Sequence, residues 1–181
     1  GMVLWNHRMN QLTGDSKYID ILERSLYNGA LAGISLGGDR FFYVNPLESK
    51  GDHHRQEWYG CACCPSQLSR FLPSIGNYIY ASSDDALWVN LYIGNTGQIR
   101  IGETDILLTQ ETDYPWDGSV KLTISTSQPL EKEIRLRIPN WCKTYDLSIN
   151  GKRINVSEKK GYAVIKDWKS QDVIALDMDM P

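Results

Sequence analysis

The sequence predicts an α+β protein in which most of the regular structure is β. Near the amino terminus apolar residues recur at helical spacing, whereas from Tyr78 onward they alternate with polar residues. The alternating segments are short and separated by turn signals such as Asn150-Gly151, as in an antiparallel β-sandwich. We therefore expect a helical domain over residues 1–76 and a β-sandwich domain over residues 77–181.

Two helices joined by a short connection are expected first. The first helix has apolar residues at helical spacing up to the break at "TGD", namely Met2, Trp5, Met9 and Leu12. Asp15 or Ser16 can cap the second helix, and Asn28-Gly29 is expected to end it. Its apolar face contains Ile19, Leu22 and Leu26.

A β-hairpin and a third helix are expected next. The hairpin strands are predicted at residues 34–36 and 40–44, with Gly37-Gly38 at the turn, and the polar loop "ESKGDHHRQE" follows. Pro65 fits the first position of the third helix, which Pro73 should end or kink and Gly76 should close. The side chains expected to face inward are Leu68, Phe71, Leu72 and Ile75.

The period-two segments are each expected to form a strand. They are "YIYAS", "ALWVNLYI", "QIRIG", "DILLTQETDY", "SVKLTISTS", "KEIRLRIP", "YDLSING", "KRINV", "GYAVIKDW" and "DVIALDMDM". Four tryptophans in this region are candidate platforms for a sugar, although aromatic residues on strands more often belong to a core. These tryptophans are Trp88, Trp116, Trp141 and Trp168.

Charge and composition exclude several classes of partner. The net charge of −3 and pI of about 5.6 give no basic balance for nucleic acid or an anionic membrane. No apolar run approaches the roughly 20 residues that span a bilayer, and the first residues do not resemble a signal peptide. Gly1 before Met2 resembles a tag-cleavage scar, and both ends look like cuts through something longer.

Three of the four cysteines lie together in "EWYGCACCPSQLSRFL", at Cys61, Cys63 and Cys64. Four cysteines are too few for a disulfide scaffold, so metal binding or a reactive thiol is the better use. Reduced cysteines favour a cytoplasmic location. With Pro65 at the first helical position, Cys64 would be the N-cap, where the helix dipole favours a thiolate.

Spacing alone leaves the use of this cysteine cluster open. Metal binding or catalysis and a buried structural cluster are about equally supported. His53 and His54 could complete a metal site, but two histidines in a polar loop are more often solvated. The distant Cys142 is expected to be an inert structural residue.

The sequence resembles glycoside hydrolase family 127, the β-L-arabinofuranosidase type. The resemblance rests on "LTGDSKYIDILERSLYNGALAGISLGGDRFFYVNPL", "EWYGCACCP" and "RFLPSIGNYIY", and it continues more weakly through "RIPNW" and "INGK". It implies that the helical part is the end of an (α/α)₆ barrel followed by a β-sandwich. It also implies a retaining exo-glycosidase that acts on arabinofuranosides, so a carbohydrate is the expected partner.

The resemblance also implies the site residues. Cys63 matches the nucleophile, which is also a zinc ligand, and Cys64 matches a second zinc ligand. Glu23 in "LERSLYNG" and Tyr43 in "FFYVNP" match positions that contact the sugar. Cys61 matches no position with a role in the family. Zinc is the cofactor of the intact family, and the sequence leaves open whether this chain retains it.

Part of the family's site has no match in this sequence. The Glu-x-Cys pair that completes the zinc site, the acid/base glutamate and the pocket histidines lie upstream in the family. We therefore expect a fragment that is itself inactive and that self-associates through apolar faces of residues 1–30, including Trp5, Met9, Leu22 and Leu26. The alternatives are a non-catalytic β-sandwich that binds carbohydrate or a protein partner, and a redox thiol protein.

Overall fold

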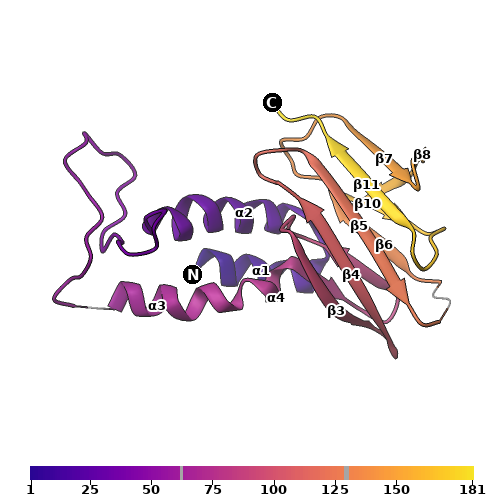
Figure 1. The fold of residues 1–181 in the computed structure, drawn as a ribbon, viewed down its shortest axis with the longest axis horizontal. Coiled ribbons are helices and arrows are strands. Elements are labelled where there is room, and N and C mark those ends of the chain that lie inside the picture. Colours follow the sequence, from indigo (N-terminus) through magenta and orange to yellow (C-terminus); the bar gives the residue numbers. More distant parts are fainter. Residues whose placement is uncertain (62, 129–130) are drawn as a thin grey trace.

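The computed structural model describes residues 1–61, 63–128 and 131–181. Helices come first and lie to one side of two β-sheets (Figure 1). The helices are α1 (Met2–Thr13), α2 (Lys17–Ser25), the π-helical turn η1 (Leu26–Ala30), the 3₁₀ turn η2 (Leu31–Gly33), α3 (Cys63–Phe71), the 3₁₀ turn η3 (Leu72–Ser74) and α4 (Gly76–Ile79). No helix among the described residues is long and apolar enough to cross a bilayer.

The strands form two sheets. The first has the order β1-β2-β6-β10-β9 and the second the order β3-β4-β5-β11-β7-β8. Their bounds are β1 (Tyr80–Ser82), β2 (Ala86–Val89), β3 (Asn95–Ile101), β4 (Thr104–Thr112), β5 (Ser119–Thr126), β6 (Glu133–Arg137), β7 (Tyr145–Ile149), β8 (Lys152–Arg153), β9 (Ser157–Lys159), β10 (Tyr162–Ile165) and β11 (Val173–Met178).

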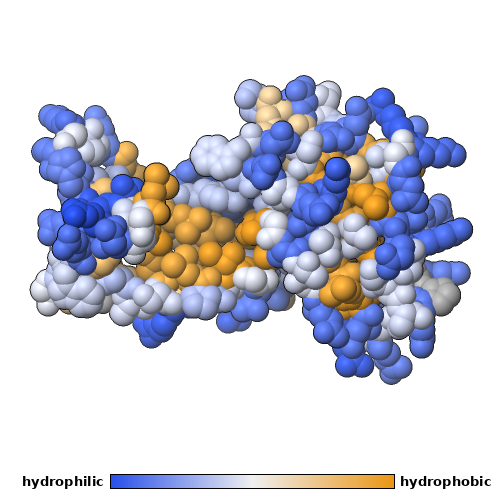
Figure 2. Space-filling view, in the orientation of Figure 1, coloured by the Kyte–Doolittle hydropathy of each residue, from blue (hydrophilic) through white to orange (hydrophobic). Residues whose placement is uncertain are grey.

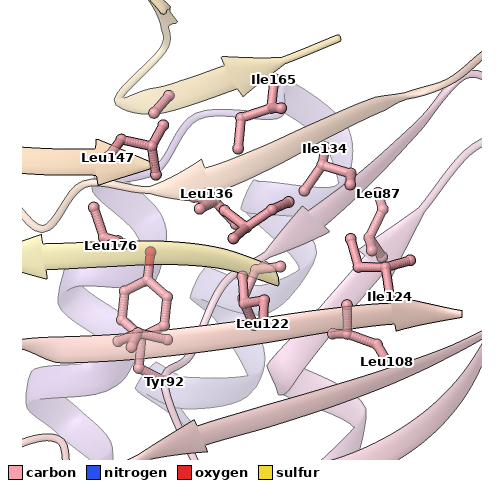
Figure 3. Close-up of a cluster of buried hydrophobic side chains, with 14 of the residues drawn as sticks. Leu87, Tyr92, Leu108, Leu122, Ile124, Ile134, Leu136, Leu147, Ile165 and Leu176 are labelled. Carbon is pink, nitrogen blue, oxygen red and sulfur yellow. The ribbon is translucent and has the colours of Figure 1, made fainter. Parts of the chain in front are cut away.

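The two sheets share one buried apolar cluster. Alternate residues of the longer strands point into it, such as Leu87 and Leu136 of the first sheet and Leu108, Leu122 and Leu176 of the second. Figure 3 shows these side chains directed toward one another between the strands. Period-two burial therefore explains why the alternating sequence forms strands here.

Most of the predicted strands are present, with two differences. Strand β2 pairs with β6 in parallel, with Ala86 opposite Glu133, so the first sheet is not purely antiparallel. The sequence of a strand does not show the direction of its neighbour. A strand that is buried on one face has the same alternation of apolar and polar residues beside a parallel or an antiparallel partner. Strand β9 was not predicted, because "SEK" is polar and exposed. The hairpin at Asn150-Gly151 is confirmed, and both turn residues have positive φ.

Helices α1 and α2 form the predicted helical pair. Gly14 ends α1 in the left-handed conformation, with φ of 62°, and its N–H donates to the Asn10 carbonyl. The predicted apolar face of α2 is confirmed, because Ile19, Leu22 and Leu26 are buried in a second cluster with Val3, Tyr78 and Leu91. The prediction that Leu22 and Leu26 would be exposed is therefore wrong, since other parts of the chain cover them.

Helix α1 buries a different side from the one that its apolar spacing indicated. Met2, Trp5 and Leu12 are exposed, whereas the polar Asn6 and Asn10 are buried. The two asparagines can be buried because each amide donates a hydrogen bond, from Asn6 to the Met2 carbonyl and from Asn10 to the Tyr162 hydroxyl.

Three features between residues 26 and 76 differ from the prediction. Asn28-Gly29 does not end the second helix, which continues through the turns η1 and η2. The predicted hairpin is reduced to the isolated bridges Ile34–Phe41 and Phe41–Gln56, although Gly38 does take a positive φ at its turn. Gly76 begins α4 rather than closing the third helix.

Candidate active site

Two adjacent thiols and a tyrosine meet at the start of α3. The sulfurs of Cys63 and Cys64 lie 3.7 Å apart. The Tyr43 hydroxyl lies 3.6 Å from the Cys63 sulfur, and the Tyr43 carbonyl oxygen lies 3.6 Å from the Cys64 sulfur. Helix α3 begins at Cys63, so both cysteines belong to its first turn and Pro65 is its third residue rather than its first.

This arrangement divides the protons unequally between the two thiols. The hydrogen bond with Tyr43, followed by those with Cys64 and Cys61, lowers the pKa of Cys63 below the ordinary thiol value. Partial burial and the hydrogen bond with Cys63 raise the pKa of Cys64. The same contact with Cys63 raises the pKa of Tyr43 to about 12, so its phenol stays protonated. The Cys63 thiol donates to this hydroxyl, and the hydroxyl can donate in turn once Cys63 is a thiolate. Cys63 is therefore the better nucleophile of the two thiols.

The thiols open into a cavity of about 400 Å³. Its wall is mostly apolar and comes from α1, the turns after α2, the Phe41–Tyr43 segment and α3, with Val3, Ala30 and Phe71 among the lining residues. Figure 2 shows apolar atoms gathered on this helical side of the molecule. Such a cavity can hold one sugar-sized ligand against a reactive sulfur.

Aromatic contacts hold the Tyr43 segment in place. The Tyr43 ring lies 5.6 Å from the Tyr59 ring, and the Tyr59 hydroxyl donates to the Phe41 carbonyl at 3.2 Å. The Phe42 ring lies 4.9 Å from the His53 ring and 4.6 Å from the Arg55 guanidinium. The polar loop thus positions the tyrosine, which the sequence alone did not indicate.

The thiol pair suits two of the four ligands of zinc. Sulfurs bound to one tetrahedral zinc lie about 3.8 Å apart, because zinc–sulfur bonds are about 2.3 Å long, and Cys63 and Cys64 are 3.7 Å apart. Among the described residues, however, no group of three or more His, Cys, Asp and Glu side chains could hold a metal. The Nε2 atom of His53 lies 2.8 Å from the Val44 carbonyl oxygen. The described residues thus bring two sulfurs together at a zinc-compatible spacing, without a third protein ligand beside them.

Glu23 lies outside the cysteine cavity, at the junction between α2 and the sheets. It forms an ion pair with the fully buried Arg137 of β6, and it accepts a hydrogen bond of 3.0 Å from the Tyr114 hydroxyl. Asp20, one turn earlier, pairs with the same guanidinium at 2.9 Å. Glu23 is thus paired with an arginine but is buried rather than solvated, and its predicted contact with a sugar stays a prediction.

Arg137 is the centre of this junction, and no sequence pattern indicated it, because "RLRIP" places two arginines on one strand. Its Nε atom also donates to the Asn90 carbonyl at 2.6 Å. Burial alone would lower the pKa of Arg137, but the neighbouring Glu23 charge and the other groups around it raise the pKa overall. The guanidinium therefore stays charged and bonds the helical layer to the first sheet.

The remaining candidates fall in different environments. Cys61 is exposed, whereas Cys142 is half-buried with its sulfur 3.2 Å from the Thr144 carbonyl oxygen. Burial raises the pKa of Cys142, which fits an unreactive thiol. Trp168 belongs to the core, and Trp116 is 90% exposed.

A cavity with a low-pKa cysteine at a helix start, a paired thiol and a tyrosine donor defines a thiolate site that can act on a substrate or bind a soft metal. Comparisons with known proteins give this site its family. Residues 1–77 match the family model described as β-L-arabinofuranosidase, GH127 catalytic domain, and residues 86–180 match the model described as β-L-arabinofuranosidase, GH127 middle domain. The chain belongs to glycoside hydrolase family 127.

Individual relatives agree with this assignment. A non-reducing end β-L-arabinofuranosidase of Bifidobacterium longum subsp. longum is 36% identical over 99% of this chain and 30% of its own length. The crystal structure of a GH127 β-L-arabinofuranosidase from Geobacillus stearothermophilus T6 has a TM-score of 0.91 and 44% identity, over 99% of this chain and 31% of that one. A structure described as a GH127 β-arabinofuranosidase has a TM-score of 0.94 and 41% identity, over 100% of this chain and 31% of that one. The chain thus spans less than a third of the relatives that it matches.

Proposed function

We propose that this chain is part of a retaining glycoside hydrolase that releases non-reducing-end L-arabinofuranosyl residues, with Cys63 as the nucleophile. The observation that carries the proposal is the Cys63–Tyr43 contact beside an apolar cavity, in the segment that matches the family's catalytic domain. The Bifidobacterium relative is a non-reducing end β-L-arabinofuranosidase, and this activity supplies the substrate class.

The reaction follows from the thiolate. The Cys63 sulfur attacks the anomeric carbon, a carbon–sulfur bond forms, and the bond to the leaving oxygen breaks as that oxygen takes up a proton from a general acid. Water then gives up a proton to the same group, which now acts as a base, and its oxygen displaces the sulfur and restores the thiolate, so two inversions give net retention. The Tyr43 hydroxyl stabilises the thiolate before attack and positions it toward the cavity.

Zinc would be held by Cys63 and Cys64 together with ligands from outside the described residues. When bound, zinc keeps a cysteine deprotonated at neutral pH. The role of this chain's own residues is to place the two sulfurs at a spacing that suits tetrahedral ligation.

We also propose that the chain by itself does not turn over substrate. No aspartate or glutamate is present among the described residues that line the cysteine cavity, so no carboxylic acid there can protonate the leaving group. Loss of a general acid usually lowers the rate by about 10²–10⁴-fold.

We infer that residues 1–76 are the end of an (α/α) barrel and that residues 77–181 form a β-sandwich. The helices packed side by side support the first inference, and the single apolar cluster shared by two sheets supports the second.

A structural cysteine cluster is the competing explanation. Structural cysteines are usually buried, yet Cys61 and Cys63 are exposed and Cys64 is only half-buried. The exposure of these thiols favours a chemical role.

An electrophile shaped like the substrate tests the proposal on the chain itself. A bromoacetyl derivative of L-arabinofuranosylamine should alkylate Cys63 faster than Cys61 or Cys142, as measured by peptide mass spectrometry, and excess L-arabinose should slow that reaction. Equal rates at all exposed cysteines, without protection by arabinose, would contradict it. Hydrolysis of an aryl β-L-arabinofuranoside above a Cys63→Ser control would overturn the inactivity.

A further inference from the structure

A second cavity, of about 840 Å³, lies where the helices meet the edge of the sheets. Its walls are the end of α1, the start of α4, strand β1 and strand β3, which forms one edge of the second sheet. We call it the junction groove. None of its lining residues belongs to the cysteine cavity, so the two sites are separate.

The junction groove is lined by neutral polar groups. Amide side chains predominate, from α1, α4 and β3, and hydroxyls come from β1 and β3; the amides are Asn10, Gln11, Asn77, Asn95 and Gln98. Arg100 is the one charged side chain among the described lining residues, and no carboxylate lies among them. Amides and hydroxyls both donate and accept, which matches the hydroxyls of a sugar rather than a cation or a polyanion.

Several of these amides are available to a ligand. In the described part of the chain, the side chains of Gln11, Asn77 and Gln98 make no hydrogen bond, and all three are exposed. Asn95 and Asn10 are instead fixed by neighbours: Asn95 accepts from the Tyr80 hydroxyl at 3.2 Å, and Asn10 donates to the Asp15 carbonyl at 3.0 Å. The groove therefore contains two amides held by hydrogen bonds within the protein and three amides that can donate to and accept from a ligand.

Two half-buried aromatic side chains complete the groove, Tyr80 and Trp88. The Tyr80 ring packs over Gly97 of β3, where a Cβ atom would lie 3.4 Å from the ring, at ordinary van der Waals distance. The Arg135 guanidinium lies 4.7 Å from the Trp88 ring. The Trp88 indole N–H has no acceptor within the described ranges. Such rings offer apolar surface to the C–H face of a sugar.

We propose that the junction groove is a binding site for a neutral oligosaccharide, distinct from the site that contains Cys63. The groove is large enough for more than one sugar unit, since drug-sized ligands occupy about 300–1,000 Å³. The site holds a glycan chain against the helix–sheet junction and is a binding site only, because no aspartate, glutamate, histidine or cysteine is among its described lining residues. This inference does not depend on the proposed hydrolase activity.

Isothermal titration calorimetry with linear arabino-oligosaccharides of three to five units tests the proposal, with oligogalacturonides of equal length as the anionic comparison. We expect the neutral series to bind and the anionic series not to bind. Asn77→Ala and Gln98→Ala should each weaken binding by about tenfold, as loss of one ligand hydrogen bond does. Asn155→Ala removes an exposed amide outside the groove and should leave the affinity unchanged.

A Cys63→Ser variant separates this inference from the proposed function. Binding that persists in Cys63→Ser and falls in Gln98→Ala supports the junction groove, whatever the outcome of the alkylation experiment. Binding that is unaffected by Asn77→Ala and Gln98→Ala, or no heat of binding at millimolar sugar, overturns it. Circular dichroism of each variant shows that a loss of binding is not a loss of fold.

Discussion

At the scale of single residues, Tyr43 decides which thiol is the reactive one. Its hydroxyl is 3.6 Å from the Cys63 sulfur, whereas only its carbonyl approaches Cys64. A hydrogen bond to the charged form of a group lowers the pKa of an acid. The pair is therefore asymmetric although the two cysteines are neighbours in sequence.

The first prediction concerns the pH dependence of alkylation in protein freed of metal by a chelator. The pKa of Cys63 is lowered and that of Cys64 is raised, so thiolate forms at Cys63 first as pH rises, and iodoacetamide should modify Cys63 at a lower pH than Cys64. Tyr43→Phe removes the donor and should move the Cys63 profile to higher pH. Peptide mass spectrometry measures both rates, and Tyr18→Phe, which removes a tyrosine hydroxyl outside the cysteine cavity, is the control. Identical profiles for Tyr43→Phe and the unmodified chain would contradict this account.

Arg137 is the residue on which the helix–sheet junction depends. Its side chain is completely buried and neutralised by Asp20 and Glu23. Removing one partner of a buried ion pair leaves the other charges uncompensated.

The second prediction follows from this burial. Arg137→Ala should lower the free energy of unfolding by about 3–5 kcal/mol, as measured by urea denaturation. Arg153→Ala breaks an ion pair with Asp146 whose side chains are 74% and 61% exposed, and it should cost less than about 1 kcal/mol. Equal effects of the two substitutions would show that the buried pair contributes no more than a surface pair.

At the scale of elements, close backbone approach fixes how β11 meets the chain before β5. A Cβ atom on Gly118 would lie 2.1 Å from the Met178 carbonyl oxygen, and the Met178 amide donates to the Gly118 carbonyl at 3.1 Å. No side-chain movement can relieve a clash with backbone.

The third prediction is that Gly118→Ala lowers the free energy of unfolding by about 1–3 kcal/mol because it separates the end of β11 from this segment. Gly29→Ala, where a Cβ atom would meet nothing within 4 Å, should be neutral or slightly stabilising. Thermal unfolding followed by circular dichroism compares the two. A stable Gly118→Ala variant would mean that the strand end moves freely.

Sequence patterns predicted the elements that depend on local signals and missed those that depend on distant partners. The alternation of apolar and polar residues predicted strands such as β4 and β5, and Asn150-Gly151 predicted the hairpin between β7 and β8. The parallel pairing of β2 with β6 and the position of Arg137 arise from contacts between distant residues, which no local pattern contains.

The candidate site was predictable in part for the same reason. Cys63 and Cys64 are adjacent in sequence and are followed by a helical pattern, so a helix start beside them could be predicted. The prediction from Pro65 placed the first residue of α3 two positions too late, because the helix begins at Cys63. Tyr43 was identified by the family resemblance and not by its own pattern, because the loop that brings it to Cys63 has no periodicity. The burial of Glu23 could not be predicted, because its ion-pair partner Arg137 is distant in sequence.

At the scale of the whole molecule, one helical surface remains uncovered. Large apolar side chains of α1 are exposed, and they include Met2 at 56%, Trp5 at 63% and Leu12 at 80%. Apolar surface of this kind usually associates with a partner.

The fourth prediction is that the isolated chain self-associates through residues 1–30. Multi-angle light scattering should show a mass that rises with concentration, and the double substitution Trp5→Ser and Leu12→Ser should reduce that rise. Trp116→Ser, which removes an exposed tryptophan outside this segment, should not reduce it. A monomer at every concentration would contradict the prediction.

The central claim is that Cys63 and Cys64 form half of a zinc-thiolate centre. X-ray absorption spectroscopy of the zinc-loaded chain measures this directly, by counting the sulfurs bound to the metal. We expect two sulfur ligands at about 2.3 Å, both lost in the Cys63→Ser, Cys64→Ser double variant and both kept in Cys142→Ser. Zinc bound without sulfur, or a sulfur count that the double variant leaves unchanged, would contradict it.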